Sequence, residues 1–269
     1  MIKQRGGAEI VISYNCSTWS ARKAHNLEVA WFKSRPRYFI FKMPSLVLGI
    51  DDAGRGPVIG PMILAGVLLE KKDEAELKKL GVKDSKQLSP RRREFLAQEI
   101  KKLAKDYHIV KVSASEIDSL MAKKINLNKI EAIKAAEIIN ELTKNFEKNL
   151  DYIEIIIDCP SVNIKAWQDY LLQHIKKEKI KIRCEHKADV KYVVVSAASI
   201  LAKTTRDAEL EKIKQQYKIE CGSGYPSDPL CIKFLKTPEA KELAKKGLVR
   251  KSWQTWKEKK QKQKKLEDF

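Results

Sequence analysis

Hydrophobic and polar positions from residue 45 onward follow two alternating periods. Compact apolar runs predict buried strands, and five occur in order: SLVLGID, PMILAGVLLE, YHIVKVSA, YIEIIID and IKIRCEHKAD. The first two are joined by a short Gly/Pro-rich connection, so we expect them to pair antiparallel. We expect the last run to end near Asp189.

The segments between these runs place apolar residues at three- and four-residue spacing, which predicts helices. Ser89 is expected to cap one of them, with Pro90 at its first helical position. VVVSAASILAKTTRDAELEKIKQQY is predicted to form one long helix. Strands and helices in this order predict an α/β domain with a mixed sheet. Beyond the turn-rich GSGYPSDP, the chain is expected to be helical and increasingly charged.

The first 42 residues have no clear period apart from the short run EIVISY. We expect them to form a flexible basic leader, or to be sequence upstream of the true start. Met43 stands directly before PSLVLGID, where ordered structure is expected to begin. We therefore expect Met43 to be the natural initiator.

Composition narrows the class of protein. The chain has 269 residues with 43% hydrophobic content, enough to bury a sizeable core. No apolar run approaches the ~20 residues of a membrane-spanning helix, so no membrane partner is expected. The five cysteines are scattered and never in C-x-x-C spacing, which favours a reducing cytosol and hence a cytoplasmic protein.

Positive charge is concentrated at both ends of the chain, within a formal net charge of +19. Residues 1–43 hold eight lysines and arginines against two acids, and residues 241–269 hold eleven against four. A basic chain with basic ends favours a polyanionic partner, most often nucleic acid. Solubility, or the lysine-rich habit of a whole proteome, is the alternative explanation.

Three acidic residues share one position in the predicted sheet. Asp51, Asp158 and Asp189 each fall at or just beyond the end of a strand, the edge where ligands bind in open α/β sheets. Carboxylates there can hold two hard cations such as Mg²⁺ ~3.5–4 Å apart, the arrangement used for phosphodiester cleavage. Taken singly, Asp158 and Asp189 are equally well explained as N-caps of the helices that follow.

Asp51 and Asp52 are adjacent, which capping does not explain. Neighbouring side chains on a regular strand point to opposite faces. Both can face one ion only where the strand ends and twists. The glycines that follow in GIDDAGRGPVIG are expected to provide that ending.

Five motifs closely resemble, in order, those of type 2 ribonuclease H (ribonuclease HII), and in particular of its archaeal members. They are GIDDAGRGPVIGP, GVKDSKQLSP, IIIDCPSVN, HKADVKYVVVSAASILAKTTRD and GSGYPSDP. The resemblance runs from about Leu46 to Leu235. It implies a ribonuclease H-like α/β fold, a mixed β-sheet flanked by helices, with a C-terminal helical extension. The expected parts are a leader (1–43), a catalytic domain (44–220), a helical substrate-binding extension (221–258) and a basic tail (259–269).

The resemblance implies an endoribonuclease that cuts the RNA strand of RNA–DNA hybrids and incises 5′ of single ribonucleotides in duplex DNA. The products would carry 3′-hydroxyl and 5′-phosphate ends, and the cofactor would be Mg²⁺ or Mn²⁺, as two ions. The family's catalytic, metal-binding acids map onto Asp51, Asp52, Asp158 and Asp189. Its substrate contacts map onto Gly54, Arg55, Gly56, Ser85, Lys86 and Tyr225, and its DSK element begins at Asp84.

Elementary chemistry supports these substrate contacts. Glycines let the backbone approach the sugar edge, where the 2′-hydroxyl separates RNA from DNA. Tyr225 can pack against a sugar, and Arg55 and Lys86 can neutralise phosphate charge. The alternatives are a core tyrosine, a solvent-facing arginine and a simple turn.

One departure from the family pattern concerns Asp52, because the first motif usually reads Asp-Glu. Asp52 is shorter by one methylene, about 1.5 Å of reach, so we expect retained activity with greater Mn²⁺ dependence. The alternative is a weakly active or inactive hybrid-binding homologue. A sugar kinase is disfavoured because a second glycine-rich nucleotide loop is missing. Ribonuclease HIII is disfavoured because its motif and N-terminal domain differ.

The chain ends in QKKLEDF, which places Gln263, Leu266 and Phe269 at the spacing of a motif that docks replication proteins on the sliding clamp. A terminal helical turn would project the two apolar side chains into a hydrophobic groove. A frayed lysine-rich tail is the alternative. We expect the protein to be a monomer.

Overall fold

The computed structural model describes residues 2–4, 10–12, 46–83, 88–146, 153–177 and 180–257. The chain falls into two units, residues 1–44 and residues 45–269. The first contains an antiparallel ribbon of β1 (Ile2–Gln4) and β2 (Ile10–Ile12). The ribbon's second strand lies within the predicted run EIVISY, whereas Met43 lies outside the described residues.

A five-stranded mixed sheet in the order β5-β4-β3-β6-β7 forms the centre of the second unit. β3 (Leu46–Ala53) and β5 (Asp106–Val112) both pair antiparallel with β4 (Met62–Glu70). β6 (Ile153–Asp158) pairs parallel with β3 and with β7 (Ile182–Glu185). The predicted α/β fold with a mixed sheet is confirmed.

The strand predicted over residues 180–189 is too long. β7 ends at Glu185, and Lys187 adopts a left-handed backbone conformation with φ 55°. That conformation ends the extended backbone, so Asp189 lies in a short helix, α6 (Ala188–Lys191).

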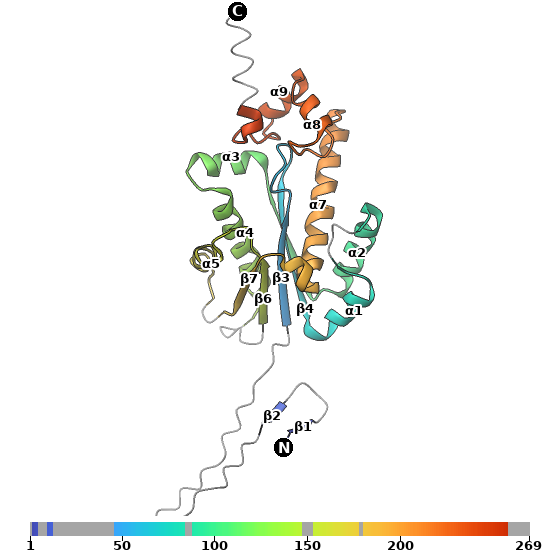
Figure 1. Ribbon diagram of the computed structural model, residues 1–269, viewed down its shortest axis with the longest axis vertical. Helices are drawn as coiled ribbons and strands as arrows, with labels where there is room; N and C mark the ends of the chain where they lie inside the picture. Colours follow the sequence, from blue (N-terminus) through green and yellow to red (C-terminus); the bar gives the residue numbers. More distant parts are fainter. Residues whose placement is uncertain are drawn as a thin grey trace, which may run out of the picture. The chain divides into compact units, whose positions relative to one another are not determined.

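Helices cover both faces of the sheet (Figure 1). One face packs against α3 (Ala114–Ala122), α4 (Leu127–Leu142) and α5 (Ile164–Leu172). The other packs against α1 (Glu74–Lys79), which follows the short helix η1 (Lys71–Asp73), and against α2 (Pro90–Leu103) and α7 (Val193–Tyr217). Burial on both faces explains why the strands are continuous apolar runs.

α7 approaches the backbone of β3 closely because Gly49 has no side chain. A Cβ at Gly49 would lie 2.5 Å from the carbonyl carbon of Val194, so a larger residue would push the helix away. α7 is a single helix of 25 residues, as predicted. The close packing places the middle of α7 beside the end of β3.

The C-terminal extension, at the top of Figure 1, has its own apolar cluster. α8 (Pro229–Phe234) and α9 (Pro238–Lys245) pack against the last turns of α7 and against Val58 and Ile59 of the β3–β4 connection. An isolated bridge joins Ile59 to Val249. The predicted helical extension is therefore confirmed, and it rests directly on the loop after β3.

Local signals explain where several helices begin. The Ser89 hydroxyl accepts a hydrogen bond from the Arg92 N–H at 3.3 Å, and Pro90 is the first residue of α2. This is the predicted cap. Within the described residues, no helix combines the length and the apolar character that crossing a membrane requires.

Candidate active site

Two of the predicted acids, Asp51 and Asp52, lie near the end of β3, at the edge of the sheet where β6 also ends. The pairing of β3 with β6 ends at Ile50 and Ile157, whereas the ladder with β4 continues to Ala53. β3 ends directly before Gly54, as expected, but its end lies one to two residues beyond the aspartates, because β4 supports the backbone on one side. Asp51 and Asp52 remain on a regular strand and project to opposite faces.

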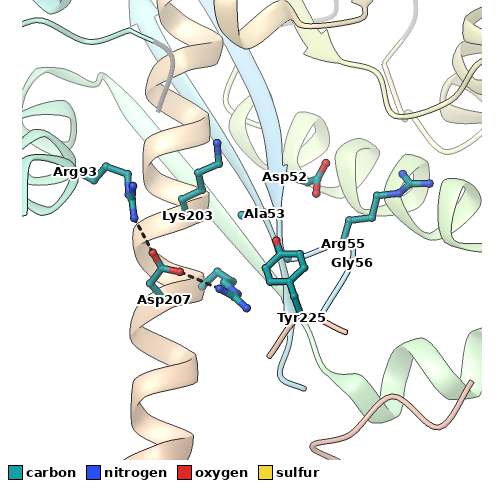
Figure 2. A pocket seen from close by; sticks show the side chains of 10 residues that line it. Asp52, Ala53, Arg55, Gly56, Arg93, Lys203, Asp207 and Tyr225 are labelled. Atoms are coloured by element: carbon teal, nitrogen blue, oxygen red, sulfur yellow. Dashed lines mark hydrogen bonds and ion pairs between the residues drawn. The ribbon is translucent and has the colours of Figure 1, made fainter. Parts of the chain in front are cut away.

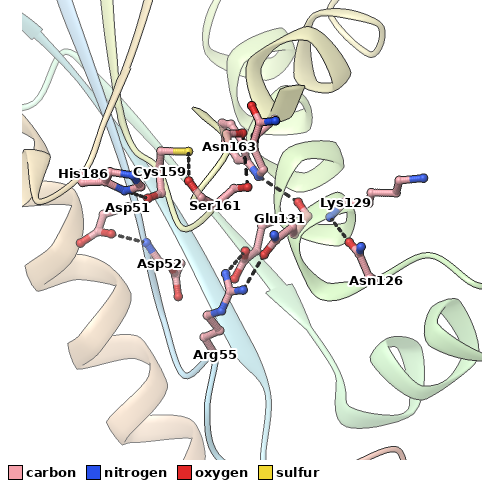
Figure 3. A network of polar contacts seen from close by, with 12 residues as sticks. Asp51, Asp52, Arg55, Asn126, Lys129, Glu131, Cys159, Ser161, Asn163 and His186 are labelled. Atoms are coloured by element: carbon pink, nitrogen blue, oxygen red, sulfur yellow. Dashed lines mark hydrogen bonds and ion pairs between the residues drawn. The ribbon is translucent and has the colours of Figure 1, made fainter. Parts of the chain in front are cut away.

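Asp51 is buried on the α7 side of the sheet and accepts a hydrogen bond from the Asp52 N–H at 2.8 Å (Figure 3). Burial raises the pKa of its carboxyl group well above the usual value, and repulsion from Asp52 and Asp158 raises it further. A hydrogen bond with Ser199 of α7 opposes this rise. Burial and two neighbouring carboxylates therefore make negative charge on Asp51 costly.

Asp52 lies half-buried on the other side. Burial is the largest cause that raises its pKa to about 6, and the charge of Asp158 adds to it. The positive charges of Arg55, Lys203 and Arg250 oppose the rise. Positive charges thus oppose the rise in pKa at Asp52, whereas hydrogen bonds oppose it at Asp51.

Asp158, the last residue of β6, connects this edge to Asp189. Its Oδ1 accepts a hydrogen bond from the N–H of Ala188 at 2.9 Å, at the start of α6. Asp189 is the next residue and is 5% exposed. The hydrogen bond thus joins Asp158 to the backbone directly before Asp189. Through α6, the structure therefore connects Asp189 to this edge of the sheet.

The capping explanations for these two acids do not hold. Asn163 caps α5 by accepting a hydrogen bond from the Ala166 N–H at 3.0 Å. α7 begins after Tyr192 without a side-chain cap. Neither Asp158 nor Asp189 therefore caps the helix that was predicted for it.

The donor chemistry fits hard divalent cations. Asp51, Asp52 and Asp158 repel one another in buried surroundings, and cations would relieve that cost. No three acid, histidine or cysteine side chains within the described residues converge closely enough to enclose an ion by themselves. Mg²⁺ in nuclease-like sites takes only one or two carboxylates and completes its shell with water and substrate phosphates.

A cavity of about 300 Å³ opens beside Asp52 (Figure 2). Its lining comes from the end of β3, the following loop, α2, α7 and the GSGYPSDP turn: Asp52, Ala53, Gly54, Arg55, Gly56, Arg93, Lys203, Arg206, Asp207 and Tyr225. The structure thus brings together one predicted acid with four of the predicted substrate contacts.

Space requires one glycine of this loop, Gly54, and a side chain at the second, Gly56, would crowd Tyr225. Gly54 has φ +82°, and a Cβ there would lie 2.9 Å from the carbonyl oxygen of Pro61. A Cβ at Gly56 would lie 3.2 Å from Cε1 of Tyr225. Tyr225 is partly exposed, and the guanidinium of Arg206 lies 5.1 Å from the centre of its ring. The tyrosine is therefore a cavity wall and not a core residue.

Arg55 is not simply solvent-facing. It forms an ion pair with Glu131 of α4, and its second terminal nitrogen donates to Oδ1 of Asn128 at 2.5 Å (Figure 3). Glu131 is buried, and burial, with repulsion from Asp52, raises its pKa to about 8 against the opposing charge of Arg55. Its Oε1 has no hydrogen-bond partner among the described residues.

Glu131 and Asn128 had no predicted role. The available signal was an acid within the apolar stripe of α4, next to the buried Ile130 and Ala132. The cluster of Arg93, Arg206 and Asp207 had no assigned role either. Asp207 pairs with Arg93 at 3.2 Å and with Arg206 at 3.1 Å (Figure 2).

Some predicted residues lie outside the described parts of the chain. They are the DSK residues Asp84, Ser85 and Lys86 and the tail residues Gln263, Leu266 and Phe269. Their predicted roles stay predictions.

The mixed sheet, the acids beyond its parallel strands and the C-terminal helices define a nuclease of the ribonuclease H class. The family model for ribonuclease HII matches residues 48–256, so the chain belongs to the ribonuclease HII family. It is accordingly an endonuclease that yields 5′-phosphomonoesters. The match extends past Leu235, where the recognised motifs end.

Known proteins agree with this assignment. Ribonuclease HII of Methanothermobacter thermautotrophicus is 44% identical over 217 residues, which cover 80% of this chain and 99% of that protein. The crystal structure of ribonuclease H2 from Pyrococcus horikoshii OT3 is similar with a TM-score of 0.68 at 37% identity, covering 81% of this chain and 98% of that one. The enzyme in the PCNA:RNase HII complex from Archaeoglobus fulgidus is similar with a TM-score of 0.64 at 39% identity, and the match covers 78% of this chain and 95% of that one.

Proposed function

We propose that this ribonuclease H cuts the RNA strand of RNA–DNA hybrids and also incises 5′ of single ribonucleotides embedded in duplex DNA. It would use two divalent cations, Mg²⁺ or Mn²⁺, and leave 3′-hydroxyl and 5′-phosphate ends. The observation that carries the proposal is the set of mutually repelling carboxylates, Asp51, Asp52 and Asp158, beside the cavity formed by the Gly-Arg-Gly loop. Membership of the ribonuclease HII family supports the hybrid as substrate.

Asp51, Asp52, Asp158 and Asp189 are the residues that would hold the cations. When bound, such cations stabilise charge on the scissile phosphate and activate water for attack. The hydrogen bond from Ala188 fixes the direction of the Asp158 carboxylate.

The chain's remaining site residues would bind and orient the substrate. The backbone at Gly54 and Gly56 would approach the ribose, since no side chain obstructs it there. Tyr225 would pack against the sugar, and Arg55 would contact phosphate. Ser85 and Lys86 are proposed to bind phosphates too, from the family pattern alone.

The weakly active or inactive alternative rests only on Asp52 in place of glutamate. No contact in the described part of the site favours it: Asp52 lines the cavity and interacts electrostatically with Asp158. A catalytic enzyme is therefore the better proposal.

We also propose that the tail binds a sliding clamp through Gln263, Leu266 and Phe269. The support is the tail's spacing together with the Archaeoglobus fulgidus relative, which was solved in complex with PCNA. Deleting the last seven residues should abolish clamp pull-down and spare hydrolysis of a short hybrid. Persistent clamp binding after the deletion would rule this out. A monomer in the cytoplasm remains our expectation.

The decisive experiment presents a duplex with one ribonucleotide, and separately an RNA–DNA hybrid, with Mg²⁺ or Mn²⁺. Wild type should cut both, and Asp158→Asn should cut neither at a comparable rate. Failure of the wild type to cut either substrate with either ion would contradict the enzymatic proposal. Cleavage of the hybrid alone would restrict the function to hybrids.

A further inference from the structure

The loop between β3 and β4 is supported by a segment almost at the far end of the described chain, residues 248–253. The N–H of Arg250 donates to the carbonyl oxygen of Val58 at 2.8 Å. Such long-range pairing of two connecting segments gives the loop a fixed backbone on the side away from the cavity.

Arg250 makes the main contacts of this support. It is fully buried, yet all its guanidinium nitrogens donate to loop carbonyls: to Gly54 at 2.6 Å, to Arg55 at 2.8 Å and to Gly60 at 3.2 Å. Burial lowers its pKa to about 10, so the side chain stays charged at neutral pH. A planar fork of donors suits several fixed acceptors, which a lysine cannot match.

Trp253 extends the same support by one residue. Its Nε1 donates to the carbonyl oxygen of Gly56 at 3.0 Å, and its ring lies 4.8 Å from the guanidinium carbon of Arg250. Three successive carbonyls of the Gly-Arg-Gly element thus accept hydrogen bonds from these two side chains.

The direction of these carbonyls sets the direction of the neighbouring N–H groups. In a trans peptide unit the C=O of one residue and the N–H of the next point in opposite directions. Fixing the carbonyls of Gly54 and Arg55 toward Arg250 therefore turns the N–H groups of Arg55 and Gly56 away from it. Neither N–H group has a backbone partner within the described part of the chain, and both residues line the cavity.

We propose that Arg250 and Trp253 are positioning residues for the cleavage reaction. They hold the Gly-Arg-Gly carbonyls on the inner side of the loop, so that two N–H donors face the ribose of the substrate. This inference rests on the proposed function, because it assigns the loop to ribose recognition. It predicts that loosening the support slows the chemical step more than it weakens binding of the duplex.

The 248–253 segment is itself fixed to the body of the protein. Asp118 of α3 accepts hydrogen bonds from the N–H of Lys251 at 2.7 Å, from the N–H of Ser252 at 3.0 Å and from its hydroxyl at 2.6 Å. Arg250 therefore reaches the loop from a rigid base, and a lysine in its place would lose donors without releasing the segment.

The test compares Arg250→Lys and Trp253→Phe with wild type on a duplex carrying one ribonucleotide. Arg92→Lys is the control, because Arg92 also donates to a backbone carbonyl, that of Leu80 at 2.5 Å, but does not line the cavity. The melting temperature of each variant is measured first. kcat and KM are then measured at a temperature at which all the variants are folded.

Arg250→Lys is expected to lower kcat about 10- to 100-fold, the loss typical of misplaced reacting groups, with KM nearly unchanged. Trp253→Phe removes one neutral hydrogen bond and should lower kcat about 2- to 10-fold. Arg92→Lys should leave both parameters at the wild-type value. A lowered melting temperature with wild-type kcat would make Arg250 purely structural and overturn the inference.

The outcomes separate this inference from the proposed function. Wild type that does not cut contradicts the function and, with it, the inference. If the wild type cuts and Arg250→Lys has an unchanged kcat, the result overturns the inference but not the proposed function. If Arg250→Lys does not fold, Trp253→Phe decides: reduced kcat supports positioning, and unchanged kcat overturns it.

Discussion

The two adjacent aspartates of β3 occupy contrasting surroundings. Asp51 lies on the α7 side, where its hydrogen bonds come from neutral groups, the Asp52 N–H and Ser199. Asp52 lies on the other side, where the charges of Arg55 and Arg250 lower its pKa against the effect of burial. The difference shows that packing partners, as well as neighbours in sequence, determine how costly each carboxylate is. We therefore expect the Asp51 side to depend more on a bound cation than the Asp52 side.

The largest expected effect comes from Asp51→Asn. Removing this carboxylate should lower single-turnover cleavage by about 10³-fold, or about 4 kcal/mol of barrier. In EDTA the same change should raise the melting temperature, because a buried charge is removed, by about 2–4 °C per kcal/mol gained. Asp52→Asn is the matched control and should gain less stability, since arginines already compensate Asp52. An equal gain in the two variants would contradict the contrast.

The Asp52 side also contains a buried acid that should make stability depend on pH. The pKa of Glu131 rises to about 8 in the folded protein, so between about 4.5 and 8 the folded state binds more protons than the unfolded state. The contribution of Glu131 to stability is fully present below about pH 4.5 and is lost as the pH rises through about 8. Glu131→Gln should remove up to about 1.4 kcal/mol per pH unit from the slope.

Denaturant unfolding in EDTA from pH 5 to pH 9 measures that slope in wild type and in Glu131→Gln. Glu137→Gln, on the same helix but exposed, is the control and should leave the slope unchanged. If the free energy of unfolding changes equally with pH in wild type and in Glu131→Gln, Glu131 does not cause the pH dependence of stability.

The smallest expected effect concerns the length of Asp52. Asp52→Glu should raise Mg²⁺-supported cleavage relative to Mn²⁺-supported cleavage about 3- to 10-fold, or about 0.6–1.4 kcal/mol. The reason is that the longer side chain restores the reach usual in the family. Rates with each ion on the same duplex measure this ratio. If the ratio does not change, the shortened acid has no consequence for metal preference.

Much of the fold could be predicted because local signals agree with the tertiary structure. The five apolar runs became the five strands of the sheet, and Ser89 with Pro90 began α2 as expected. The motifs identified the family. These features depend on residues close together in sequence.

The errors and omissions in the site have a different origin. The end of β3 depends on β4 continuing to pair after β6 has diverged, and sequence alone does not show which partner stops first. Glu131 and Arg250 gain their roles from contacts 76 and 195 residues away in the chain, with Arg55. Periodicity marks Glu131 as an acid within an apolar stripe, but it cannot reveal the partner of either residue.

The 195-residue separation between Arg55 and Arg250 also has a consequence for biosynthesis. At about 5–20 residues per second, a ribosome adds Arg250 roughly 10–40 s after Arg55. During that interval the nascent chain has the segment that forms β3, with Asp51 and Asp52, but lacks the side chains that donate to the loop carbonyls. The loop can take its final form only once Arg250 has been added, so a chain terminated before Arg250 would carry the acids beside an unsupported loop.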